Sequence, residues 1–237
     1  MTDRTPAGRT QIPAVALALP FEGRWLVQNS PARRVPSHGT DLLGETYAID
    51  FVAVDGRRRT ARRRDWRTYL ATEPADRFYA FARPLLAPAD GTVVDVHDGK
   101  VDHAARRSQL RLLGYALSQQ NRLRQGIPAI AGNYLIIELR SGSGFVALVH
   151  LRAGTLRVAV GDQVTTGQHV AECGNSGNST QPHVHVQVMD SLDLSVARGI
   201  PIAFRKFREW SRGRGRDGPV RELGLPGEGS VVEPIMS

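Results

Sequence analysis

The sequence predicts a mainly β domain built on an antiparallel sheet, with two helical insertions between its strands. Segments rich in valine, isoleucine, leucine and aromatic residues recur along the chain, and clusters of glycine, proline, asparagine, aspartate and serine separate them. Apolar and polar residues alternate within several of these segments, as in half-buried strands. The short turns favour antiparallel pairing. The expected strands are residues 47–54, 91–97, 134–140, 144–151, 168–173 and 183–189.

The first expected strand, 47–54, sets one acidic side chain opposite an apolar face. Tyr47, Ile49 and Phe51 alternate onto one side of this strand. Asp50 therefore points to the other side, away from the residues that we expect to enter the core.

The last expected strand, 183–189, carries two histidines one residue apart. Strand alternation directs His183 and His185 to the same face, while the valines that alternate with them face the core. Two imidazoles on one face suit a metal ion, although two solvated histidines on a sheet surface would give the same pattern.

Two arginine-rich segments interrupt the strand pattern, and we expect insertions near residues 57–83 and 104–125. Leu110, Leu113 and Leu117 fall at helical spacing in the second segment. The chain carries a formal net charge of +8. An anionic partner such as nucleic acid could bind these insertions, but a solvated arginine-rich surface explains the same composition and is the favoured interpretation.

Length and composition indicate one large domain or two small ones. The chain has 237 residues, of which 41% are hydrophobic, an ordinary share for a globular protein. Residues 1–18 are expected to form a loose N-terminal lead-in. Residues 211–237 are rich in glycine, arginine and proline and are expected to form a flexible tail. The predicted domain therefore spans residues 19–210.

Cysteine usage and the N-terminal sequence point to a cytoplasmic location. Cys173 is the only cysteine, which excludes an internal disulfide and a thiolate zinc cluster and is typical of a reducing compartment. We recognise neither a secretory signal peptide nor a membrane span. Association with a cell wall would therefore need another export route.

Several short motifs follow one another in a recognisable order. They are His38 with a later aspartate, the turn Ala87-Pro88-Ala89-Asp90-Gly91-Thr92-Val93, the strand end Val149-His150-Leu151, the turn Gly161-Asp162-Gln163-Val164 with Gly167-Gln168, and the pair His183-Val184-His185. Over residues 39–189 this order resembles the LytM and lysostaphin-like zinc metallopeptidases. The resemblance implies a LytM-like, duplicated-hybrid-type β fold. It also implies a zinc endopeptidase that hydrolyses peptide bonds in peptidoglycan peptides or cross-bridges.

The same resemblance implies roles for five residues. It assigns one zinc ion to His38, Asp50 and His185, and catalysis to His150 and His183. Three nitrogen or oxygen ligands leave the fourth tetrahedral position of a catalytic zinc open for water, whose pKa then falls to about 7. The two catalytic imidazoles would activate water, stabilise the oxyanion or protonate the leaving amine, and the sequence does not divide these roles between them.

The motifs depart from the family pattern at the first histidine and aspartate. Many relatives separate these two by four residues, whereas here twelve residues separate His38 from Asp50. Asp41 is therefore a rival ligand. We favour Asp50 because it lies on the polar face of its strand, and ligands need to converge only in space.

Two further residues, Asn133 and Ser179, are candidates for substrate contact or for a supporting position. An alternative function is a non-catalytic peptide-binding or regulatory module that retains the fold. Lipoyl and biotinyl carrier domains share glycine-rich turns of this kind, but they need a modifiable lysine at a hairpin tip, and neither Lys100 nor Lys206 has that setting.

Overall fold

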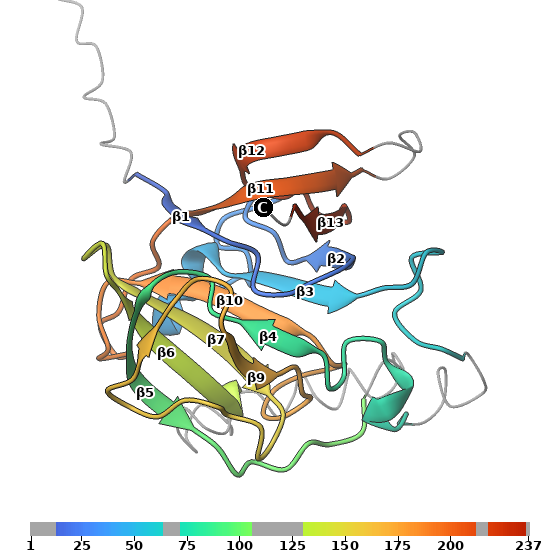
Figure 1. Cartoon of the computed structure of the whole chain (residues 1–237), viewed down its shortest axis with the longest axis horizontal. Helices are drawn as coiled ribbons and strands as arrows, with labels where there is room; N and C mark the ends of the chain where they lie inside the picture. Colours follow the sequence, from blue (N-terminus) through green and yellow to red (C-terminus); the bar gives the residue numbers. More distant parts are fainter. Residues whose placement is uncertain (1–12, 64–71, 106–129, 212–217, 236–237) are drawn as a thin grey trace, which may run out of the picture.

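The computed structural model describes residues 13–63, 72–105, 130–211 and 218–235, and these residues form a mainly β structure (Figure 1). The strands are β1 Val15–Leu17, β2 Trp25–Gln28, β3 Ile49–Ala53, β4 Pro84–Leu86, β5 Gly91–His97, β6 Asn133–Leu139, β7 Phe145–Leu151, β8 Gln163–Val164, β9 His169–Glu172, β10 Val184–Met189, β11 Ile202–Trp210, β12 Val220–Gly224 and β13 Val231–Pro234. Two short 3₁₀ helices are η1 Leu42–Tyr47 and η2 Ala75–Arg77.

Eleven of these strands form one sheet, in the order β1-β11-β13-β2-β3-β10-β7-β6-β5-β8, with β12 paired to β11. The pairs are antiparallel except for β1 and β11, which run parallel. All six strands expected from the sequence are present, with ends shifted by at most two residues. The prediction of a mainly β fold with antiparallel pairing is confirmed.

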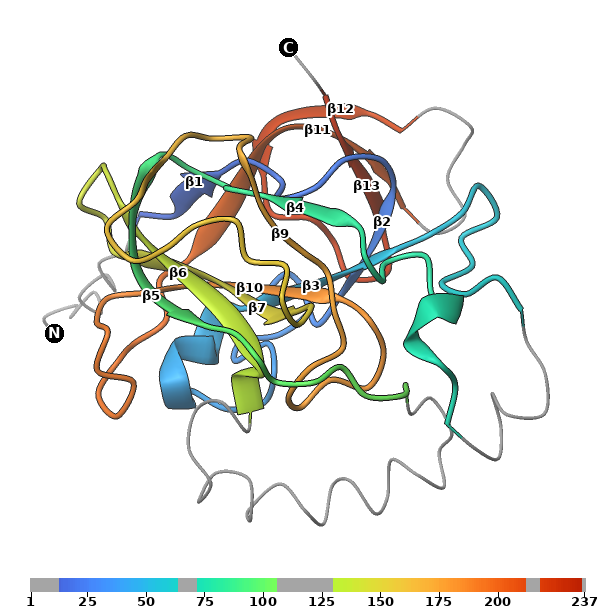
Figure 2. The ribbon, with the colours of Figure 1, turned by 60° about the horizontal axis from the view of Figure 1, so that its bottom comes forward.

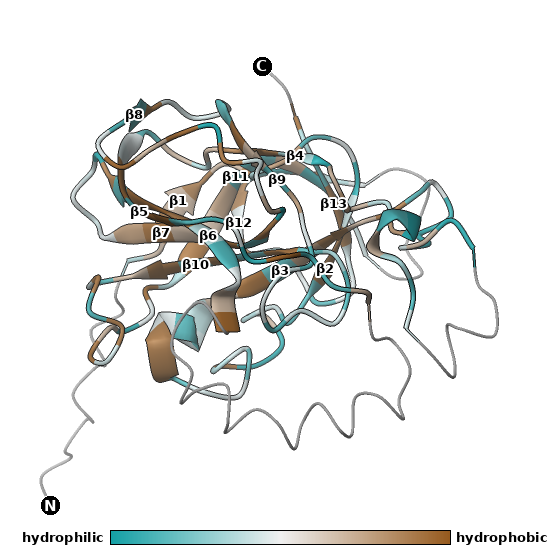
Figure 3. Cartoon of the chain, turned by 90° about the horizontal axis from the view of Figure 1, so that it is seen from below, coloured by the Kyte–Doolittle hydropathy of each residue, from teal (hydrophilic) through white to brown (hydrophobic). Residues whose placement is uncertain are grey.

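The central strands have one apolar face and one face that carries the polar residues. On β10, Val184, Val186 and Val188 enter the main core together with residues of β7 and β6 such as Leu148 and Ile137. The separate two-stranded sheet of β4 and β9 contributes to the same core. Hydrophobic colouring along β7 and β10 is visible in Figure 3.

The opposite face of β10 is covered in part by η1. Figure 2 shows this helical turn beside β10, on the side away from β4 and β9. Leu43 and Gly44 of η1 have positive φ angles of 58° and 75°. A side chain at Gly44 would place its Cβ 2.9 Å from Cβ of Met189, so glycine permits this close approach of η1 to β10.

Both ends of the described chain correct the expected domain organisation. Residues 15–17, expected within a loose lead-in, form β1, and the expected flexible tail at 211–237 contains β12 and β13. Strand β13 lies between β11 and β2, where Val231 and Val232 are buried. The region is rich in glycine and arginine, which is typical of a flexible tail, so its composition did not indicate the short apolar strand β13.

The expected insertions lie partly outside the described residues. In the stretch 57–83 the described parts form turns, the helix η2 and two isolated bridges, one between Ala61 and Phe78 and one between Glu73 and Ala105. Most of the stretch 104–125, including its predicted helical leucines, falls outside the described residues. In the part of the chain that is described, no helix is long and apolar enough to cross a membrane.

Candidate metal centre

A cavity of about 440 Å³ opens on the polar face of the central strands. Strands β3, β10, β7 and β6, the loop before η1 and η1 itself contribute to its walls. The lining includes all five residues that the sequence assigns to zinc and catalysis: His38, Asp50, His150, His183 and His185.

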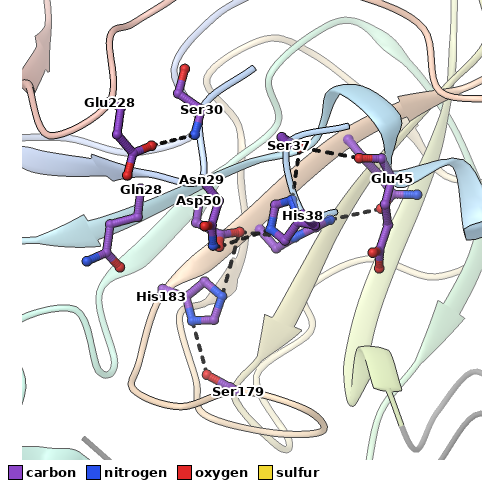
Figure 4. A network of polar contacts seen from close by, with 12 residues as sticks. Gln28, Asn29, Ser30, Ser37, His38, Glu45, Asp50, Ser179, His183 and Glu228 are labelled. Atoms are coloured by element: carbon purple, nitrogen blue, oxygen red, sulfur yellow. Dashed lines mark hydrogen bonds and ion pairs between the residues drawn. The ribbon is translucent and has the colours of Figure 1, made fainter. Parts of the chain in front are cut away.

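The pairing of β3 with β10 brings the aspartate to the second histidine of the pair. His185 is the direct partner of Asp50 in the antiparallel register, and Nδ1 of His185 lies 3.0 Å from Oδ1 of Asp50. His38 approaches from the loop that precedes η1, with Nε2 3.1 Å from Oδ2 of Asp50 (Figure 4). One ligand atom from each residue lies within 4.8 Å of the other two.

The rival aspartate lies elsewhere. Asp41 is exposed in the loop before η1, and it is not among the residues that line the cavity. The twelve-residue spacing between His38 and Asp50 is accommodated by this loop and η1, which return the chain to the start of β3. The structure therefore joins Asp50, and not Asp41, to the two histidines.

The other two histidines form a second group in the same cavity. The ring centroids of His150 and His183 are 4.7 Å apart, and Nε2 of His183 lies 3.7 Å from Oδ1 of Asp50. Nδ1 of His183 lies 2.8 Å from the carbonyl oxygen of Gln181 and 3.0 Å from Oγ of Ser179. Figure 4 shows Ser179 beside the His183 ring.

His150 reaches the cavity through an irregularity of β7. The register between β6 and β7 shifts so that His150 is an extra residue, between Val149 opposite Tyr134 and Leu151 opposite Asn133. Its φ angle is 65°, in the left-handed region that a non-glycine residue rarely adopts. This bulge lets Val149 and His150, which are consecutive, both line the cavity. Strained backbone of this kind is concentrated at functional sites.

Asp50 controls the electrostatics of the group that it forms with His38 and His185. Burial by itself raises the pKa of Asp50, but the nearby charges of His183 and His38 and the hydrogen bonds from His185 and His38 hold that pKa well below its usual range. Burial lowers the pKa of His185, yet its hydrogen bond and charge interaction with Asp50 prevail and raise the pKa to about 9. A metal ion bound here would therefore compete with a proton for Nδ1 of His185.

The pKa values of the second histidine pair move in the opposite direction. Burial lowers the pKa of His150 well below its usual range, and the neighbouring rings of His183 and His185 lower it further. Burial also lowers the pKa of His183, against the raising effect of Asp50. Both rings are therefore neutral near pH 7, the form in which an imidazole can accept a proton.

The structure separates the two candidate supporting residues. Asn133 does not line the cavity: it is fully buried, and its side chain bonds the backbone of Lys100 and Leu151. Ser179 is also fully buried, but its Oγ contacts Nδ1 of His183. Asn133 therefore links the backbone of two chain segments, whereas Ser179 contacts a histidine of the cavity.

Two cavity residues were not anticipated from the sequence. Nδ2 of Asn29 donates to Oδ2 of Asp50 over 2.7 Å, and Oε1 of Gln187 lies 2.9 Å from Nε2 of His185. Gln187 could have been found, because strand alternation places it on the same face as His185. Asn29 gives no such signal, since it lies after the end of β2 with a φ of 51°.

The donor set fits a zinc ion. Two imidazole nitrogens and one carboxylate oxygen are a usual ligand set for catalytic zinc, and all three side chains are mostly buried. The other ring nitrogens already have partners: Nδ1 of His38 lies 3.0 Å from Oγ of Ser37, and Nε2 of His185 faces Gln187. The nitrogens that face Asp50 are thus the ones left for a metal.

Comparison with known proteins gives a family match. The model of peptidase family M23 matches residues 76–197, which include His150, His183 and His185. His38 and Asp50 precede the matched range, so their place in the centre is supported by the geometry. A search of curated proteins found no match.

Three solved structures illustrate what this chain is similar to. The lysostaphin catalytic domain from Staphylococcus simulans is 17% identical, with 75% of this chain and 88% of that chain covered and a TM-score of 0.38. LytU is 18% identical, with 84% of this chain and 88% of that chain covered and a TM-score of 0.36. An alanine-to-histidine mutant of the catalytic domain of the prophage-encoded M23 protein EnpA from Enterococcus faecalis is 17% identical, with 65% of this chain and 73% of that chain covered and a TM-score of 0.36.

Proposed function

The chain belongs to peptidase family M23, and on this premise we propose that it is a zinc-dependent endopeptidase that hydrolyses peptide bonds in peptidoglycan peptides or cross-bridges. One observation carries the proposal: His38, Asp50 and His185 converge in a cavity that also contains the neutral pair His150 and His183. Ligands for a metal and acceptors for a proton thus lie within one binding site.

His38, Asp50 and His185 would hold the metal. The facing atoms are Nε2 of His38, the carboxylate of Asp50 and Nδ1 of His185. Zinc bound by such a set supplies Lewis acidity, which polarises a peptide carbonyl and lowers the pKa of water. The carboxylate also offsets part of the charge of the ion within a buried site.

His150 and His183 would move the protons of hydrolysis. Each ring has its Nδ1 near a backbone carbonyl oxygen, that of Ser176 at 2.9 Å and that of Gln181 at 2.8 Å. A carbonyl only accepts, so Nδ1 carries the hydrogen and Nε2 of each neutral ring is the proton acceptor. In hydrolysis, water adds to the peptide carbon, the carbon–nitrogen bond breaks, and an imidazole delivers a proton to the leaving amine.

The test is cleavage of peptidoglycan fragments by the purified chain, with and without a chelator. We expect cleavage that a chelator abolishes and zinc restores. A His183→Ala variant should bind zinc but lose about 10²–10⁴-fold in kcat, the usual contribution of a general acid or base. The matched control is His169→Ala on β9, because His169 does not line the cavity.

Other results would contradict the proposal. Cleavage that is unaffected by the chelator, or a His183→Ala variant with full activity, would exclude this mechanism. Zinc-independent binding of the fragments without cleavage would instead indicate a peptide-binding module that retains the fold.

A further inference from the structure

Gln187 lies between a metal-facing histidine and the loop that covers it. It is buried on the cavity face of β10, two residues after His185. Oε1 of Gln187 lies 2.9 Å from Nε2 of His185. Nε2 of Gln187 donates to the carbonyl oxygen of Leu43 over 2.8 Å. Both ends of one amide are therefore engaged, one with the ring and one with η1.

This pair of contacts determines the orientation of the amide. The carbonyl oxygen of Leu43 can only accept a hydrogen bond, so the NH₂ group of Gln187 must face it. The amide oxygen then faces the imidazole of His185, and as an acceptor it requires a hydrogen on Nε2 of that ring. In the neutral ring Nδ1 is consequently unprotonated, with its lone pair directed towards Asp50.

The position of the Leu43 carbonyl is itself constrained by the fold. Leu43 and Gly44 both have positive φ angles, so the backbone of η1 turns sharply at this point. Gly44 packs directly on β10, where a Cβ would meet Cβ of Met189 at 2.9 Å and Nε2 of Gln187 at 3.5 Å. The loop is thus held at the distance that the hydrogen bond to Gln187 needs.

We propose that Gln187 is a positioning residue that presents Nδ1 of His185 to the metal, and that η1 acts on the metal centre through it. This inference rests on the proposed zinc-dependent function. The carbonyl of Leu43 orients Gln187, and Gln187 selects the tautomer and the ring orientation of His185. Partners of this kind, which contact a ligand but not the metal, typically contribute 10–100-fold to metal affinity.

The first test measures zinc affinity by competition with a chromophoric chelator. We expect Gln187→Met, which lacks the acceptor, to bind zinc about 10–100-fold more weakly than the wild type. Gln187→Glu keeps an oxygen acceptor towards His185 but loses the donor to the carbonyl of Leu43, so its affinity should fall between those of the wild type and Gln187→Met. Gln163→Met is the matched control: its amide contacts Thr92 at the surface, and its affinity should equal that of the wild type.

The second test separates positioning from a general structural role. In the zinc-loaded wild type, the Nε2 hydrogen of His185 should be visible by NMR as a downfield imidazole signal protected from solvent exchange. In zinc-loaded Gln187→Met this signal should exchange much faster, because its acceptor is gone. A role limited to packing would leave the signal unchanged.

A second variant acts without changing any residue that contacts the ring. Gly44→Ala adds a Cβ that must move η1 away from β10, so the Leu43 carbonyl should release Gln187 and zinc affinity should fall. This variant also tests the inference if Gln187→Met does not fold.

The outcomes distinguish the inference from the function on which it rests. Wild-type zinc affinity and an unchanged NMR signal in Gln187→Met would overturn the inference alone. A wild-type chain that binds no zinc would overturn the proposed function as well. Weaker zinc binding in Gln187→Met and Gly44→Ala, with Gln163→Met unaffected, would support the positioning role.

Discussion

The cavity contains two kinds of buried histidine that differ in their relation to one carboxylate. His185 pairs with Asp50 across two strands, with Nδ1 3.0 Å from Oδ1, and its pKa is raised to about 9. His183 lies two residues earlier on the same face, with Nε2 3.7 Å from Oδ1 of Asp50, and its pKa is lowered. Burial alone therefore does not assign a role, because both rings are buried.

The partners on the far side of each ring extend this difference. The rings of His38 and His185 contact the side chains of Ser37 and Gln187. The rings of His150 and His183 contact backbone carbonyl oxygens, and His183 also contacts Oγ of Ser179. A carbonyl oxygen only accepts, so it fixes which nitrogen of His150 and of His183 carries the hydrogen.

Removal of the carboxylate should have the largest effect, because it removes what distinguishes the two kinds of histidine. We expect Asp50→Asn to weaken zinc binding by more than about 100-fold, since even partners that do not touch the metal contribute 10–100-fold. Peptidase activity should be lost with the metal. Competition with a chelator and metal analysis of the purified variant measure the effect.

Asp41→Asn is the matched control, because Asp41 is exposed and lies outside the cavity. It should bind zinc as the wild type does. The reverse result, with zinc lost in Asp41→Asn and retained in Asp50→Asn, would show that Asp41 is the ligand.

The pH dependence of stability in metal-free protein should distinguish His185 from His150 and His183. His185 has a pKa raised from its ordinary 6.5 to about 9, so its pairing stabilises the fold fully below about pH 6.5. That contribution is lost as the pH rises through 9. His150 and His183 have lowered pKa values, so they destabilise the fold as the pH falls below about 6.5.

Urea unfolding of chelator-treated wild type and of His185→Gln isolates the first contribution, because both proteins retain His150 and His183. The stability advantage of the wild type should shrink between about pH 6.5 and pH 9. A constant advantage across this range would show that Asp50 does not distinguish His185 in the way described.

The smallest expected effect concerns the backbone that carries His150. Because His150 has a positive φ, His150→Gly should be about 1 kcal/mol more stable than His150→Ala. At Ala147, an ordinary position of the same strand, the preference should be reversed, with Ala147→Gly losing about 0.5–1 kcal/mol relative to the wild type. Denaturant unfolding measures both pairs, and equal signs would contradict the bulge.

The sequence was sufficient where local alternation carried the information. The alternation of Ile49 and Phe51 with Asp50, and of valines with His183 and His185, correctly separated the core face from the cavity face. Periodicity alone did not give the pairing of β3 with β10, which brings these residues together. The choice of Asp50 over Asp41 agrees with the geometry for the same reason, because strand alternation aimed it at the cavity.

Other features depended on non-local contacts or on irregular backbone. Strict alternation directs His150 to the same face as Leu148, into the core, and only the bulge turns it to the cavity. Asn133 was a candidate for substrate contact or for a supporting position, yet its amide donates to the backbone carbonyls of Lys100 and Leu151. Val231 and Val232 make too short a strand to be recognised without the neighbours that pair with it.

The position of β13 links the candidate metal centre to the order in which the chain folds. Val231 pairs with Leu26, more than 200 residues earlier, and β2 in turn pairs with β3, which holds Asp50. Contacts of such wide separation form late and slowly in folding, because a long loop must close first. During synthesis, the edge of β2 that β13 covers therefore stays unpaired until residues 231–234 have emerged, although its other edge can already pair with β3.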